Sequence, residues 1–183
     1  MERNNMKMID RQNLAESGEA LADFPALEKK QARAVSKVLD ATAKYFEKNP
    51  HRWVASNAVV FADDPAFVNG GYGDPAPYDR YCAIGVWEYV PSALPTKAHE
   101  TMQQIAPGYN ITTIKERASE TVVQMNDGMS CVESVIEGLR TQAAAFKLNA
   151  SGISWDVAVK AAFSKNAHLL QVQQARKQKR DRN

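Results

Sequence analysis

Residues 79–90 read DRYCAIGVWEYV, and of the last ten residues only Gly85 and Glu88 are neither apolar nor aromatic. A helix that is apolar on nearly every face belongs in the interior of a protein. We therefore predict a short, buried central helix here. A buried strand is the alternative, because periodicity does not separate the two at this length. Asp79 is the predicted N-cap, since its carboxylate can accept hydrogen bonds from first-turn amides, and Pro91 ends the run.

The segments before this helix differ in composition and in the spacing of their apolar residues. Residues 1–22 are polar with few apolar side chains, so we predict a loosely ordered N-terminal arm with a single helical turn. A helix is predicted over residues 23–49, because its apolar residues recur at helical spacing. Residues 54–62 are β-prone and predict a strand. Residues 63–78 are rich in Pro and Gly, and irregular loops of this length are often functional.

Helical patterns resume after the central stretch. One helix is predicted over residues 94–106, and a second over residues 111–125, which closes at the turn Asn126-Asp127-Gly128. Ser130-Cys131-Val132-Glu133 then matches a capping box, in which Ser130 caps the backbone and Glu133 reaches back. A long helix with an inward apolar stripe follows this box.

The C-terminal part begins where residues 149–152 break the helical pattern and Ser154 is placed to cap a last helix. Its apolar pattern fades after Val172. The predicted fold is mainly α: a compact helical core domain over residues 23–148, with a short β-strand or hairpin before the central helix. A C-terminal helix with a basic tail extends it over residues 149–183.

Composition bounds the class of protein. The chain has 183 residues, 44% of them hydrophobic and 24% charged, which is ordinary for a globular domain and excludes global disorder. Its two cysteines, Cys82 and Cys131, form neither a disulfide framework nor a metal-binding spacing. No secretory signal or membrane-spanning segment is apparent in the hydropathy pattern. We therefore expect a soluble, cytoplasmic protein with no metal and no cofactor.

Charge is unevenly distributed along the chain. The net charge is +2, but residues 160–183 hold seven Lys or Arg and one Asp. The basic tail could contact phosphates of nucleic acid, and the alternative is a solvated helix end. Its candidate binding residues are Arg176, Lys177, Lys179 and Arg180.

Cys82 is the candidate catalytic residue, because a thiolate near a helix start could act as a nucleophile with His99 or His51 as its base. The alternative is a buried structural cysteine, since free cysteine is among the most buried residue types. Trp53 and Tyr72 are candidate binding residues beside the Pro/Gly loop, with a core role as the alternative for Trp53.

Several spaced motifs occur in order along residues 35–147. They are a helix ending near Asn49-Pro50-His51-Arg52-Trp53, then Asp79-x-x-Cys82-Ala83-x-Gly85, then Asn126-Asp127-Gly128 before a Val/Ile/Leu helix. This set resembles a family of small bacterial and phage domains of unknown function. The chain departs from that family in its Pro- and Gly-rich segment after Trp53 and in its added C-terminal helix. The resemblance implies that five residues meet in one structural region: Trp53, Cys82, Gly85, Asn126 and Asp127.

Taken together, these features favour a non-enzymatic interaction module of phage or bacterial origin, either virion-associated or directed at a host protein. Its expected partner is a protein or a second copy of the chain. A cysteine-dependent hydrolase or transferase and a nucleic-acid-binding accessory protein are the alternatives.

Overall fold

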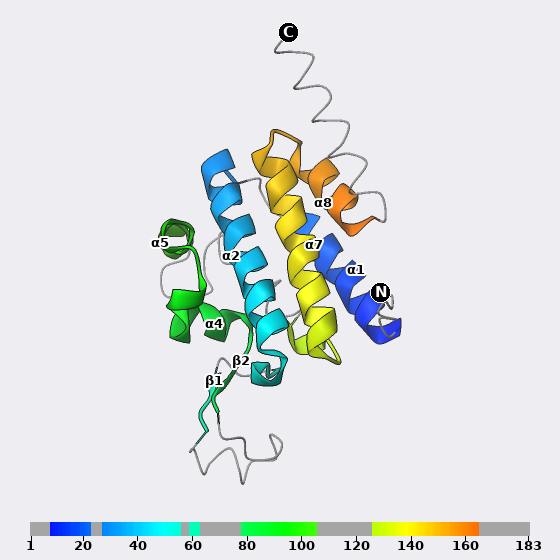
Figure 1. Cartoon of the computed structure of the whole chain (residues 1–183). Coiled ribbons are helices and arrows are strands. Elements are labelled where there is room, and N and C mark those ends of the chain that lie inside the picture. The colour runs from blue at the N-terminus through cyan, green and yellow to red at the C-terminus, as the bar shows by residue number, and fades with distance from the viewer. Residues whose placement is uncertain (1–7, 23–26, 56–58, 63–77, 106–125, 165–183) are drawn as a thin grey trace.

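The computed structural model describes residues 8–22, 27–55, 59–62, 78–105 and 126–164 (Figure 1). Two short strands pair antiparallel, with Val59 opposite Tyr81 and Val60 opposite Arg80. The fold is mainly α with a hairpin before the central helix, which confirms the predicted class. In chain order the elements are α1 (Met8–Ala22), α2 (Lys29–Lys48), η1 (Pro50–Arg52), β1 (Val59–Val60), β2 (Arg80–Tyr81), α4 (Ala83–Tyr89), η2 (Pro91–Ala93), α5 (Thr96–Ile105), α7 (Val132–Ala150) and α8 (Trp155–Phe163).

The two longest helices, α2 and α7, form the centre of the molecule and lie side by side in opposite directions (Figure 1). Helices α1 and α8 cover the far side of α7, while α5 packs against α2. The predicted apolar stripe of α2 is buried between these neighbours, including Val38, Leu39 and Phe46. The hairpin projects from the end where α2 stops and α7 begins.

The central stretch is helical as predicted, but its helix starts later. Helix α4 covers Ala83–Tyr89, and its N-cap is Cys82. The prediction that Asp79 caps this helix is wrong, because β2 lies between Asp79 and the helix. Trp87, only 1% exposed, donates its indole N–H to Thr42 Oγ1 at 2.8 Å and thereby fixes α4 against α2.

Helix α1 contradicts the expected loose arm with a single helical turn, since residues 8–22 form four turns of packed helix. Leu21 is completely buried, and the Cβ of any other residue at Gly18 would lie 2.7 Å from the ring of Phe163 in α8. This segment does have few apolar side chains. Helix α1 is held instead by its close contact with α8 and by Asp10, a completely buried carboxylate.

Helix α7 starts with Cys131 as its N-cap, and the Cys131 side chain makes no capping hydrogen bond. The predicted capping box is therefore wrong, because the Ser130 hydroxyl donates to Asp10 instead of capping the helix. The helix ends at Ala150, and Gly152 adopts a φ of 103°, a conformation that favours glycine. This break is where it was predicted.

The last described helix, α8, starts at Trp155 with Ser154 at the N-cap position, as predicted, but the Ser154 side chain makes no capping hydrogen bond. Helix α5 matches the helix predicted over residues 94–106 to within two residues at its start. The predicted helix over residues 111–125, Tyr72 and the basic tail all lie outside the described residues. None of the helices in the described parts of the chain is both long and apolar enough to cross a membrane.

Candidate functional site

Asn126 is a fully buried side chain that joins three segments at the hairpin end of the molecule. Its Oδ1 accepts hydrogen bonds from the Trp53 indole at 2.9 Å and from the Ala83 backbone amide at 3.3 Å. Its Nδ2 donates to the Val54 carbonyl and to the Asp127 carboxylate. The chain after η1, the start of α4 and the segment that leads to α7 are therefore held by one amide.

Cys82 and Gly85 lie on the same helix start as Ala83. The Cys82 thiol accepts a hydrogen bond from the Gly85 amide at 3.4 Å. Burial raises the pKa of Cys82, and the neighbouring charge of Asp127 raises the pKa further. Trp53, Cys82, Gly85, Asn126 and Asp127 thus lie in one contiguous region, where their contacts brace the backbone. A raised pKa favours the protonated thiol, which is the opposite of what a thiol nucleophile needs.

The two imidazoles considered as bases for Cys82 occupy different surroundings. His99 is buried on α5, where desolvation lowers the pKa of its imidazole and a backbone hydrogen bond links it to Trp87. His51 is exposed, and its ring packs against Tyr78 with 4.7 Å between centroids. The hydrogen bonds and the charge that act on the Cys82 thiol come from Gly85, Ile84 and Asp127. These contacts favour the structural alternative for Cys82.

Asp79 stabilises the hairpin rather than a helix. Its Oδ1 accepts from the Ala62 amide at 2.9 Å, on the chain just after β1, and its backbone carbonyl accepts from Arg52 Nη1 at 3.4 Å. The guanidinium of Arg52 also lies over the Tyr78 ring, 5.7 Å from its centroid. Asp79 therefore holds the two arms of the hairpin together and links them to η1.

Aromatic rings form a continuous chain from the core to the surface at this end. Tyr81 packs against Tyr45 on one side and stacks on Tyr89 on the other, each with 6.4 Å between centroids. Phe61 meets Tyr89 edge-on at 6.1 Å. Phe61 is 47% exposed and Tyr89 is 44% exposed, so the outer end of the chain of rings faces solvent. We call this region the aromatic surface; its exposed residues are Phe61 and Tyr89, and Tyr81 and Tyr45 pack beneath them.

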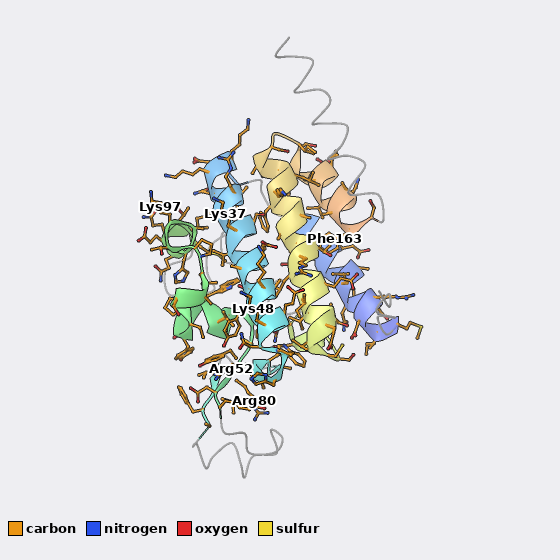
Figure 2. All side chains as sticks on the ribbon, in the orientation of Figure 1. Lys37, Lys48, Arg52, Arg80, Lys97 and Phe163 are labelled. Carbon is orange, nitrogen blue, oxygen red and sulfur yellow. The ribbon has the colours of Figure 1, made fainter. Side chains whose placement is uncertain are left out.

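Basic side chains flank the aromatic surface. Figure 2 shows Arg52 and Arg80 together at the hairpin end, with Lys48 at the nearby end of α2. Arg52 comes from η1 and Arg80 from β2. An arginine beside partly exposed tyrosines is the residue combination enriched at protein–protein interfaces.

Neither Phe61 nor Tyr89 was predicted as a binding residue; the only aromatic candidates from the sequence were Trp53 and Tyr72. Trp53 is half-buried and its indole N–H is used internally by Asn126, so it belongs to the scaffold behind the surface. Tyr72, Arg176, Lys177, Lys179 and Arg180 lie outside the described residues. Phe61 and Tyr89 come from separate segments, and no local spacing in the sequence marks them as neighbours.

A second polar cluster lies at the contact between α1 and α7 and was also missed. The Asp10 carboxylate accepts from the Ser130 amide at 2.9 Å, the Ser130 hydroxyl at 2.8 Å and the Ser134 hydroxyl at 2.6 Å. It lies at the N-terminus of α7, where the helix dipole favours negative charge. Asp10, Asn13, Leu14, Ser17 and Leu21 recur at helical spacing, and this mixed stripe was the available signal.

In the described part of the chain, no cluster of three His, Cys, Asp or Glu residues is arranged to hold a metal ion. No family model, curated protein or solved structure matches the chain. The likeness to small bacterial and phage domains therefore stays an interpretation of the spaced motifs.

Proposed function

We propose that this chain is a non-enzymatic protein-interaction module that binds its partner through the aromatic surface. The observation that carries the proposal is the exposed Phe61–Tyr89 pair, which is supported from below by Tyr81. Large aromatic side chains bury much area at little cost in side-chain entropy, so they dominate the binding energy of many interfaces. A pair already held in place by packed rings has less freedom to lose on binding.

The scaffold behind the aromatic surface supports this role. Asn126 ties Trp53 and the start of α4 together, and Asp79 ties the chain after β1 to β2. These bonds hold two segments that are distant in sequence at a fixed separation, as a preformed binding surface requires. Origin from a phage or a bacterium, and a virion or host protein as partner, belong to the same proposal and rest on the motif resemblance alone.

Site-specific photo-cross-linking in the source cells tests the proposal. A benzophenone amino acid is placed at Phe61, and in a control protein at Val157, which is similarly exposed at 41% but lies on α8. We expect a discrete protein adduct from position 61 only. Tyr89→Ala in the same protein should weaken the adduct by about thirtyfold, which corresponds to the roughly 2 kcal/mol of a hot-spot truncation.

Two outcomes would contradict the proposal. Equal yields of adduct from positions 61 and 157 would mean that the partner does not bind the aromatic surface in preference to α8. An adduct at position 61 that survives Tyr89→Ala unchanged would mean that the packed ring pair does not carry the binding. Circular dichroism of each variant establishes that the helical fold is intact before the adducts are compared.

A further inference from the structure

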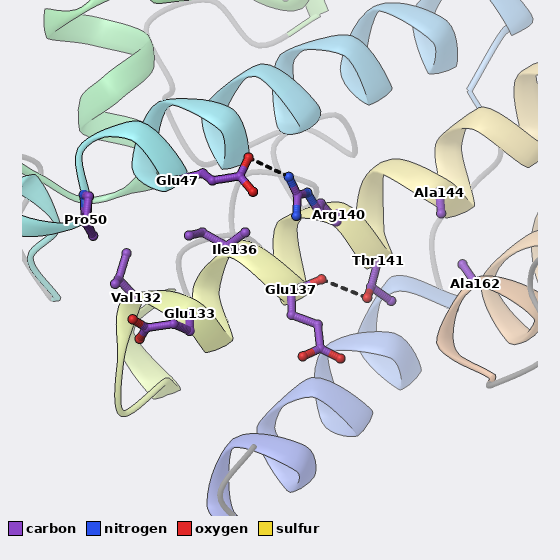
Figure 3. A pocket seen from close by; sticks show the side chains of 10 residues that line it. All are labelled: Glu47, Pro50, Val132, Glu133, Ile136, Glu137, Arg140, Thr141, Ala144 and Ala162. Atoms are coloured by element: carbon purple, nitrogen blue, oxygen red, sulfur yellow. Dashed lines mark hydrogen bonds and ion pairs between the residues drawn. The ribbon is translucent and has the colours of Figure 1, made fainter. Parts of the chain in front are cut away.

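A groove of about 640 Å³ runs along the exposed face of α7 (Figure 3). Its floor is apolar and is formed by Val132, Ile136 and Ala144 of α7 together with Ala162 of α8. Val132 and Ile136 lie toward one end in Figure 3, and Ala144 and Ala162 lie toward the other. We call this feature the acidic groove because of its rim.

The rim of the acidic groove carries Glu47, Glu133 and Glu137. Arg140 is the basic lining residue, and it pairs with Glu47 at 2.8 Å. Among the described residues, Glu133 and Glu137 make no ion pair, and both are exposed. The groove therefore presents two uncompensated carboxylates beside an apolar floor, a combination suited to a segment that is apolar in one part and basic in the next.

The chain itself contains such a segment directly after α8. Residues 165–183 hold six Lys or Arg and one Asp, a balance of +5. Because the whole chain carries +2, residues 1–164 carry −3. After Lys165, the apolar residues of this segment come first, and the other basic residues follow. The apolar residues are Leu169, Leu170 and Val172, and the basic residues after them are Arg176, Lys177, Lys179, Arg180 and Arg182.

Chain length allows this segment to follow the groove in the matching order. Ala162 lines the groove beside Ala144, and residue 165 follows three positions later. From Ala144 to Glu133, the groove follows α7 for about 16 Å, at a rise of about 1.5 Å per residue. Nineteen residues span about 28 Å even at that helical rise, so the apolar part can reach the floor and the basic part can reach Glu133 and Glu137.

We propose that residues 165–183 dock in the acidic groove of their own chain, with Leu169, Leu170 and Val172 on its floor and Arg176 and Lys177 at Glu133 and Glu137. A segment tethered this close has an effective concentration on the order of millimolar, so even weak complementarity fills the site. This inference does not rest on the aromatic surface, and the two can fail separately.

The test uses the full-length protein with a benzophenone amino acid at Leu170. After irradiation, mass spectrometry locates the adduct among the peptides. The expected result is an adduct within one chain to residues 132–144. Glu133→Lys with Glu137→Lys should lower its yield by about fivefold, because two attractive contacts become repulsive. Adding Arg176→Glu and Lys177→Glu should restore the yield.

Glu88→Lys with Glu100→Lys is the matched control, since it makes the same change in charge at exposed positions on α4 and α5. That variant should keep the adduct. An equal loss in the control would overturn the proposal by showing an effect of net charge alone. An adduct between two chains, detected by mixing isotope-labelled and unlabelled protein, would overturn it in favour of a second copy as occupant. Adducts only outside residues 132–144, or none, would also overturn it.

Discussion

Asp10 and Asn126 are both completely buried polar side chains that hold distant segments together, yet they do so in different ways. Asp10 is charged, and its oxygens accept hydrogen bonds from two serines at the start of α7. Asn126 is neutral, and it both accepts and donates. A buried carboxylate can only collect donors, whereas an amide can join backbone groups of both kinds. The first therefore locks one helix onto another, and the second organises the irregular end that carries the aromatic surface.

The largest expected effect is the loss of the Asp10 carboxylate. Asp10→Ala should lower the free energy of unfolding by about 3 kcal/mol, because it removes charge-assisted hydrogen bonds and leaves buried donors unpaired. Urea denaturation followed by circular dichroism measures it. Asp10→Asn keeps the shape and one acceptor, so its loss should be smaller. Glu16→Ala on the same helix is exposed and should change little.

If Asp10→Ala lowers the free energy of unfolding by less than about 0.5 kcal/mol, the carboxylate does not hold α1 against α7. Such a result would mean that α1 is held by the apolar contacts of Leu21 and by the fit of Gly18 against Phe163. The hydrogen bonds of Asp10 would then contribute little to the stability of this contact.

Asn126→Ala should lower the free energy of unfolding somewhat less, by about 2 kcal/mol, because Asn126 itself is neutral but the Trp53 indole and the Ala83 amide lose their acceptor. The same urea titration measures it. Trp53→Phe supplies the partner substitution for a double-mutant cycle. If the bond between Trp53 and Asn126 is as strong as its 2.9 Å geometry indicates, the two losses should not add. Fully additive losses would show that the two residues contribute separately.

Asp10 and Asn126 also show which parts of the fold sequence patterns can predict and which parts they cannot. The long helices α2 and α7 and the start of α8 could be predicted from apolar stripes and from breaks such as Gly152. A helix that buries one face has apolar residues at the helical period. Helix α1 does not follow from such a stripe. Its buried face includes Asp10 and Ser17, and their partners lie far along the chain, where a local pattern cannot show them.

Caps were wrong for a related reason. Asp79 and Ser130 are good capping residues by type, but each uses its side chain in a tertiary contact: Asp79 with the Ala62 amide and Ser130 with Asp10. The grouping of Trp53, Cys82, Gly85, Asn126 and Asp127 was implied by the motif resemblance. The aromatic surface could not be predicted, because Phe61 and Tyr89 become neighbours only when β1 and α4 are placed in three dimensions.

A smaller effect should appear in the pH dependence of stability. It arises from His99, which contacts α4, the helix whose start is held by Asn126. His99 packs at the backbone of Trp87 in α4, and burial lowers its pKa below the usual 6.5. The unfolded chain therefore binds a proton at a higher pH than the folded one. The stability contributed by neutral His99 is fully present above pH 6.5 and declines as the pH falls from there to the folded pKa.

His99→Gln removes this titration. The drop in the urea midpoint between pH 7 and pH 5 should be smaller in the variant than in the parent protein. The carboxylates titrate in both proteins, so the difference between the two isolates the imidazole. An identical drop would mean that His99 is as easily protonated in the folded chain as in the unfolded one.

The smallest effect is purely kinetic, and the two cysteines report it because each belongs to one of the compared regions. Cys131 is partly exposed, with its sulfur 3.3 Å from the Ser134 hydroxyl that donates to Asp10. Cys82 is 7% exposed, and burial raises its pKa. Iodoacetamide should therefore label Cys131 at least about tenfold faster than Cys82 in the folded protein.

The two destabilising substitutions, Asn126→Ala and Asp10→Ala, should then act locally. Asn126→Ala should speed the labelling of Cys82 with little change at Cys131, and Asp10→Ala should do the reverse, since each opens its own region before the whole chain unfolds. Equal acceleration of both thiols in either variant would mean that the two regions open as one unit. If Cys82 is the faster thiol in the parent protein, it is not a structural cysteine. Burial and a raised pKa both slow alkylation, and only an activated thiolate would react faster in spite of them.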